Sequence, residues 1–218
     1  MKKFLFASGF LLLSVSCAFA QKDTGIAVKA STLGAGVEVI KGVSDKLEAR
    51  LGLNWFSYDH DSTEAGIKYD IDLDLLSVGL LLDYRPFDSN FFLSAGVLWN
   101  DNELDLTAKY AGTVTIGDNT YTSSQAGTVR GNLSFDDFAP YIGLGWRSKL
   151  GSNSSWSFTF ELGVLYQGSP NVSLTADGSL ASNSAFLADL EKERSQLDDD
   201  LDDYKYYPVV SIGLVKKF

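Results

Sequence analysis

The feature that most constrains this chain is a period-two alternation of apolar residues with polar or small ones. Residues 47–58, 91–100, 138–147 and 156–167 each place apolar side chains on one parity and polar, charged or small side chains on the other. Such alternation is typical of β-strands with two unlike faces. The apolar faces can meet in a soluble sandwich, or they can face lipid around a membrane barrel with a polar interior. Alternation alone leaves both architectures open.

The N-terminus resembles an export signal. Lys2 and Lys3 precede an apolar run over 4–15, and Ala18-Phe19-Ala20 is an A-x-A cleavage site. Lipidation at Cys17 is the alternative, although Ser14 stands where a leucine is expected. No later run approaches the roughly 18 apolar residues of a membrane-spanning helix. We therefore expect an exported chain that can enter a membrane only as strands.

Three further features favour a membrane barrel. Segments of ten residues or more suit tilted membrane strands better than soluble ones. Aromatic residues such as Trp55, Tyr84 and Trp156 gather near segment ends, as in the girdles of outer-membrane barrels. Short connections alternate with long ones, as periplasmic turns alternate with outer loops. The short ones fall at 42–46, 86–90 and 151–155, and the long ones at 59–67, 107–133 and 170–205.

We predict an all-β fold, an eight-stranded antiparallel transmembrane β-barrel, because two periplasmic ends require an even number of strands. The expected organisation is a removed signal peptide over 1–20 and an outer-membrane barrel domain over 21–218. The parity changes after Leu75, which indicates a β-bulge or a hairpin whose outer part stands above the membrane. The predicted strands are 25–31, 34–43, 46–58, 67–85, 90–106, 134–150, 155–169 and 206–218.

The C-terminus predicts the partners of such a barrel. Phe218 ends a strand-like segment over 209–218 and resembles the signal read by the barrel assembly machinery. Lys216 departs from that signal, since an aromatic or apolar residue is usual there. We expect the barrel assembly machinery, outer-membrane lipid and lipopolysaccharide as partners, in the outer membrane of a Gram-negative cell.

Composition argues against most other functions. Of 218 residues, one is Cys and one is His, so disulfides, Cys-based zinc sites and most acid–base chemistry are not expected. A formal net charge of −10 argues against nucleic acid as a partner. His60 stands between Asp59 and Asp61 in a predicted loop, where histidines are usually solvated. We therefore expect no catalytic residue, no cofactor and no metal.

Four motifs follow one another along the chain: LLLDYRPF (80–87), NELDLT (102–107), APYIGLG (139–145) and YQGSPNVSL (166–174). In this order they resemble the CarO-type outer-membrane barrels, the carbapenem-associated and ornithine-uptake family. The likeness runs from about residue 25 to the end of the chain. It implies an eight-stranded barrel and, for some members, slow passage of ornithine, other basic amino acids or small drugs.

The polar parity points charged side chains into the lumen. An eight-stranded barrel is only wide enough to be filled by its own side chains. The charges can therefore form a paired ionic plug, since buried unpaired charges are costly. Alternatively, they line a narrow polar path. The lumen residues predicted are Glu48, Arg50, Asp83, Arg85, Arg147 and Glu161.

A row of three aspartates lies toward the expected outer rim. Asp70, Asp72 and Asp74 share one face of a strand, so they repel one another and need cationic partners, water or a cation. They can focus negative potential and attract cationic solutes, or they can belong to a solvated strand extension. A calcium site is not expected, because no DxDxDG loop is present.

One segment, Ser184–Tyr204, predicts an acidic helix in the last outer loop. Leu187, Leu190, Leu197 and Leu201 fall near one face, and acidic residues dominate the rest. The apolar stripe suggests a lid over the barrel mouth. The acidic face can be solvated, or it can bind lipopolysaccharide through divalent cations.

The function predicted is a narrow outer-membrane channel for small cationic or amino-acid-like solutes. The alternative is a non-conducting structural or adhesive barrel that acts through its outer loops.

Overall fold

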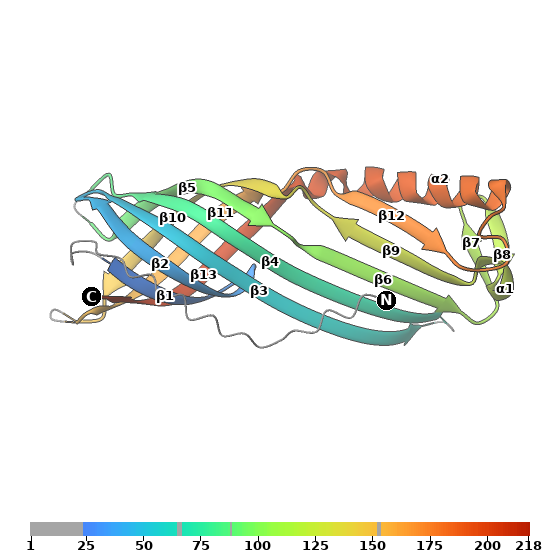
Figure 1. Ribbon diagram of the computed structural model, residues 1–218, viewed down its shortest axis with the longest axis horizontal. Coiled ribbons are helices and arrows are strands. Elements are labelled where there is room, and N and C mark those ends of the chain that lie inside the picture. The colour runs from blue at the N-terminus through green and yellow to red at the C-terminus, as the bar shows by residue number, and fades with distance from the viewer. Residues whose placement is uncertain (1–23, 65–66, 88, 152–153) are drawn as a thin grey trace.

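The computed structural model describes residues 24–64, 67–87, 89–151 and 154–218. The predicted signal peptide over 1–20 lies outside these residues. Within the described part, a barrel occupies one end of the long axis and a sheet extension occupies the other (Figure 1).

Eight strands close into an antiparallel barrel, as the alternation predicts. The closing ladder joins β1 to β13, with Gly25 opposite Lys217 and Ser31 opposite Ser211. Closure matters because hydrocarbon offers no hydrogen-bond partner to a free strand edge. In order around the barrel, the strands are β1 (Thr24–Ser31), β2 (Gly34–Ser44), β3 (Leu47–Glu64), β4 (Ile67–Tyr84), β5 (Phe91–Asn100), β10 (Phe138–Lys149), β11 (Trp156–Tyr166) and β13 (Tyr206–Lys217).

The barrel is apolar outside and polar inside, which is the reverse of a soluble protein. The outward side chains of Leu80 and Ile142 are 57% and 68% exposed, whereas the inward side chains of Asp83 and Arg50 are 0% and 2% exposed. A continuous exposed apolar belt of this kind is unfavourable in water and favourable in lipid. None of the helices in the described ranges is long and apolar enough to cross a membrane.

Strands β3 and β4 run on past the barrel, and β4 changes partner where they leave it. Its barrel half pairs with β5, beginning at Ser77 opposite Asn100. Its outer half pairs with β6 (Glu103–Tyr110), beginning at Asp74 opposite Glu103. β9 (Thr128–Ser134) and β12 (Asn171–Ala176) continue the sheet beyond β6. These outer parts form the extension.

The parity change after Leu75 marks the boundary between barrel and extension. The β3–β4 ladder continues from Leu47–Tyr84 to Glu64–Ile67 without a register shift, so the predicted alternative of a bulge is wrong. Instead, the outer part of the hairpin extends beyond the closed barrel. In the barrel half of β4, the odd-numbered residues face the lumen. In the outer half, the odd-numbered residues face the inner side of the extension, and their side chains are apolar.

A small tip subdomain closes the far end of the extension. It contains β7 (Thr113–Ile116), β8 (Asn119–Thr122) and α1 (Ser123–Ala126). The acidic helix predicted over Ser184–Tyr204 is α2 (Ser184–Leu201), followed by the short 3₁₀ helix η1 (Asp202–Lys205). Helix α2 begins with Asn183, whose side chain accepts hydrogen bonds from the N–H groups of Ala185 and Phe186.

Helix α2 lies lengthwise along the extension and does not cross the barrel mouth (Figure 1). The predicted lid position is therefore wrong. The physical reason is that Phe186 and Leu190, one turn apart, are buried with Ile116 and Ala126 in the tip subdomain. Leu187, which the sequence assigned to the apolar stripe, is exposed instead.

The strand predicted over 90–106 is two strands, β5 and β6. The chain breaks at Asp101 and Asn102, where Leu76 supplies both hydrogen-bond partners. The Leu76 carbonyl accepts from the Asp101 N–H at 2.8 Å, and the Leu76 N–H donates to Asn102 Oδ1 at 3.1 Å. A side chain thus replaces one ladder bond, and β6 continues alongside the outer half of β4.

A charge on the lipid face should destabilise the barrel. Leu80 lies on the outward face between Leu51 and Val97, near the middle of the barrel half of β4. We expect Leu80→Arg to lower the free energy of unfolding in lipid vesicles by about 2–4 kcal/mol, because the guanidinium must be placed in hydrocarbon. Denaturant titration of the reconstituted protein measures this change.

Ser173→Arg is the matched control, because Ser173 is exposed on the outer face of the extension. It should change the free energy of unfolding by no more than about 0.5 kcal/mol. Equal costs for the two variants would contradict the assignment of the Leu80 face to lipid.

Candidate functional site

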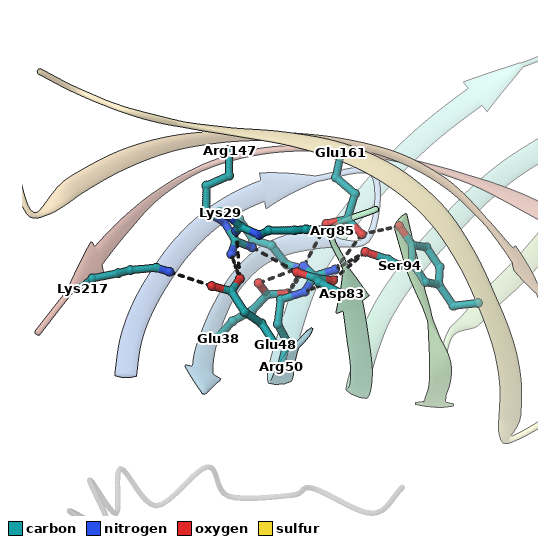
Figure 2. A network of polar contacts seen from close by, with 11 residues as sticks. Lys29, Glu38, Glu48, Arg50, Asp83, Arg85, Ser94, Arg147, Glu161 and Lys217 are labelled. Atoms are coloured by element: carbon teal, nitrogen blue, oxygen red, sulfur yellow. Dashed lines mark hydrogen bonds and ion pairs between the residues drawn. The ribbon is translucent and has the colours of Figure 1, made fainter. Parts of the chain in front are cut away.

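The candidate site is an ionic network that fills the barrel lumen (Figure 2). Strand alternation carries its members inward from every side. Arg50 lies at the centre, where its Nε bonds Asp83 Oδ1 at 3.0 Å and its two Nη atoms bond the Glu161 carboxylate at 2.8 and 2.9 Å. Arg50 also lies 3.2 Å from Glu38 Oε2 and donates to Ser94 Oγ at 3.0 Å. One guanidinium therefore joins three carboxylates from three strands.

A second guanidinium extends the network toward the short turns at the barrel end opposite the extension. Arg147 Nη2 lies 3.2 Å from Asp83 Oδ2, and its Nη1 bonds Glu48. Glu48 also receives Arg85 Nη2 at 3.0 Å and Lys217 Nζ at 2.6 Å. On the other side, Lys29 Nζ bonds Glu38 Oε1 at 2.6 Å. The network thus pairs each carboxylate with at least one cation. Its carboxylates are Glu38, Glu48, Asp83 and Glu161, and its cations are Lys29, Arg50, Arg85, Arg147 and Lys217.

An aromatic ring supports both central guanidinium groups. The Cζ atoms of Arg147 and Arg50 lie 5.0 and 5.8 Å from the centroid of the fully buried Phe92 ring. Cation–π attraction is stronger in such a desolvated setting than at a surface. The ring fits because residue 145 is glycine. A Cβ there would lie 2.3 Å from Cζ of Phe92.

Glycines also make room for a tyrosine that orients Glu161. The Tyr141 hydroxyl donates to Glu161 Oε1 at 2.5 Å. A Cβ at Gly163 would lie 2.3 Å from that hydroxyl oxygen, and a Cβ at Gly143 would lie 2.5 Å from it. These glycines therefore leave room for inward-pointing side chains in the lumen.

An apolar layer closes the lumen on the outer side of the network. Its buried side chains come from five barrel strands and from the turn between β1 and β2. A cavity of about 20 Å³ lies between this layer and the network, with Gly52 and Gly79 in its wall. That volume holds roughly one water molecule, so the lumen is closed in this conformation. The layer consists of Leu33, Leu81, Leu98, Ala139, Tyr141, Leu165 and Val209.

The structure brings together all six lumen residues named from the sequence. It adds Lys29, Glu38 and Lys217, which sequence reasoning missed. Their signal was present, because each occupies the inward parity of its strand.

The aspartate row lies outside the lumen. Asp70, Asp72 and Asp74 point to the outer face of the extension, on the same parity as the lipid-facing residues of β4. Lys68 and Lys109 lie 3.1 and 3.4 Å from Asp70. Slight desolvation and the carboxylates of Asp59, Asp105, Asp70 and Asp74 raise the pKa of Asp72. In the described part of the chain, no group of three or more His, Cys, Asp or Glu residues is placed to hold a metal ion.

Breaking the network should cost far more than breaking an exposed ion pair. We expect Arg50→Met to lower the free energy of unfolding by about 3–5 kcal/mol, because it leaves buried carboxylates without their shared partner. Denaturant titration in lipid vesicles measures the change.

Arg130→Met is the matched control. Arg130 Nη1 lies 2.9 Å from Asp177, but both side chains are about half exposed, so its loss should cost no more than about 1 kcal/mol. A cost for Arg50→Met as small as that of the control would contradict the central role of Arg50 in stability.

The comparisons with known proteins agree with this architecture. No protein-family model and no curated protein matches the chain. Among solved structures, CarO2 of Acinetobacter baumannii is 27% identical with a TM-score of 0.61, and the match covers 89% of this chain and 98% of that one. CarO of the same organism is 25% identical with a TM-score of 0.56, covering 92% and 100%. The resemblance seen in the motifs is therefore confirmed over most of the chain, and the chain is an outer-membrane β-barrel protein that is similar in structure to these CarO proteins.

Proposed function

We propose that the protein is a narrow outer-membrane channel for small cationic or amino-acid-like solutes, closed at rest. The observation that carries the proposal is that the lumen is closed by side chains alone. The ionic network and the apolar layer both come from the barrel wall and the β1–β2 turn. Helix α2 and the tip subdomain lie along the extension, beyond the barrel (Figure 1).

Opening such a barrel needs side-chain movement and not the expulsion of a domain. If the ion pairs separate, the charged groups can exchange partners for water, and inward Ser94, Thr159 and Ser211 offer further hydrogen bonds. The apolar layer sets a second barrier, because an apolar constriction resists wetting. Two barriers in series fit slow passage of small polar solutes.

Charge supports the preference for cations. The chain carries a formal net charge of −10, and Asp70, Asp72 and Asp74 add an acidic row to the extension. Such fields raise the local concentration of cations, although physiological salt screens them beyond about 8 Å.

Liposome swelling tests the solute preference. The refolded protein, with folding checked by heat-modifiable migration, is compared in ornithine, a neutral amino acid of similar size and glutamate. We expect ornithine to enter fastest and glutamate slowest. Replacing the three aspartates by Asn should reduce the lead of ornithine, because it removes negative charge. Swelling no faster than in empty liposomes would overturn the channel proposal.

Trimming the apolar layer should speed swelling if the lumen is the pathway. Leu98 and Leu165 are buried inward members of the layer. We expect Leu98→Ala combined with Leu165→Ala to raise the swelling rate several-fold, because the smaller side chains widen the apolar constriction and a wider constriction wets more easily. The matched control is Val97→Ala with Val164→Ala, their lipid-facing neighbours. Equal rates for the two double variants would place any flux outside the lumen.

A second candidate, a non-conducting surface barrel, is favoured by a different observation. The long connections fold into an ordered extension with a tip subdomain, an arrangement suited to meeting a partner outside the cell. If the trimmed barrel is folded and still does not conduct, this second candidate replaces the channel.

A further inference from the structure

The inner face of the extension carries an apolar chamber that the channel proposal does not use. Apolar residues of β4, β6, β9 and β12 face inward together, since their registers place Leu73, Leu104, Leu133 and Val172 side by side. Helix α2 covers this face only in part. Two cavities of about 380 and 470 Å³ remain, and they share Leu104, Leu133 and Leu201 as walls. Small-molecule sites usually have about 300–1,000 Å³ and mostly apolar walls.

The chamber persists because α2 is fixed at its other end. Phe186 packs edge-on against Tyr121 with ring centroids 4.9 Å apart, and Asn119 Nδ2 bonds Asp189 Oδ2 at 2.7 Å. The Gly117 N–H donates to Glu193 at 3.1 Å. Beyond Glu193 the helix spans the chamber, with Leu197 and Leu201 partly buried over it. The helix therefore roofs the chamber without filling it.

Two buried side-chain amides at the barrel end of the chamber each have one polar atom without a hydrogen-bond partner. Asn102 and Gln167 are 5% and 3% exposed, and both line the chamber. Asn102 Oδ1 accepts from the Leu76 N–H at 3.1 Å, which leaves Asn102 Nδ2 as an unpaired donor. Gln167 Nε2 donates to the Tyr204 carbonyl at 3.1 Å, which leaves Gln167 Oε1 as an unpaired acceptor. The backbone partners fix both amide orientations.

Buried polar atoms without partners are costly, so they indicate a bound group. A donor and an acceptor in one apolar chamber match a group that also has both, such as an amide. Charge narrows the choice further, because the Glu193 side chain lines the chamber. Burial, Tyr69 and Glu193, in that order, raise the pKa of the Tyr110 phenol, which lines the same chamber. An anionic head group is therefore disfavoured.

We propose that this chamber binds a small amphipathic molecule with an apolar body and a neutral amide group, held by Asn102 and Gln167. The site is separate from the lumen, so it stands or falls independently of conduction. It adds a binding activity on the outer side of the barrel.

The test uses the full barrel in lipid nanodiscs and calorimetric titration with octanamide, with empty nanodiscs as the background. We expect saturable binding of one octanamide per barrel. Octanoate has the same chain but an anionic head, and it should bind at least about tenfold more weakly, which corresponds to about 1.4 kcal/mol. Equal affinities for the two would overturn the proposed recognition of a neutral amide.

Three variants test whether the ligand binds in the chamber. Leu133→Trp fills the wall that both cavities share and should abolish saturable binding. Thr107→Trp, on the outer face of β6, is its matched control and should keep it. Gln167→Met keeps the side-chain length but removes the acceptor, and it should weaken octanamide about tenfold while leaving octanoate little changed.

Two results would overturn the proposal. One is the absence of saturable binding above empty nanodiscs, which would mean that water alone satisfies the two amides. The other is binding that survives Leu133→Trp in a barrel with unchanged heat-modifiable migration, which would place the ligand in lipid or elsewhere on the protein.

Discussion

The constraint on which this structure depends is the need of every backbone N–H and C=O in hydrocarbon for a partner within the protein. The ladder between β1 and β13 meets it by joining the first and last barrel strands. Closure with eight strands then leaves an interior only as wide as its side chains. The inward charges must neutralise one another at close range, and Arg50 does so with carboxylates from β2, β4 and β11 at once.

The same alternation has opposite meanings in the two halves of β4. In the barrel half, outward Leu80 meets lipid and inward Asp83 meets Arg50 and Arg147. In the outer half, the outward residues are aspartates, and inward Leu73 meets the roofed chamber. The strand continues across the change without a register shift, so only its surroundings differ between the barrel and the extension. The parity change therefore marks the point at which the outward face of β4 stops being apolar.

The sequence was sufficient for the barrel and insufficient for the extension. Alternation placed the eight barrel strands because lipid and lumen impose a strict period of two. The predicted strand continued across Asp101 and Asn102, where the structure has a break. That break depends on hydrogen bonds to Leu76, which is distant in sequence. The strands β7 and β8 have four residues each, which is too short for alternation to identify a strand. Part of the lumen network could be predicted, since parity identified Glu48 and Arg147. Lys29 and Glu38 are recognised as members only from their contacts in the folded barrel.

The uninterrupted β3–β4 ribbon also has a mechanical consequence. One ladder of paired residues runs from Leu47–Tyr84 in the barrel to Glu64–Ile67 in the extension, with no bulge or glycine at the barrel mouth. A continuous ribbon of this kind resists bending at the mouth. Displacement of the extension would therefore be transmitted to the two barrel strands that hold Arg50 and Asp83.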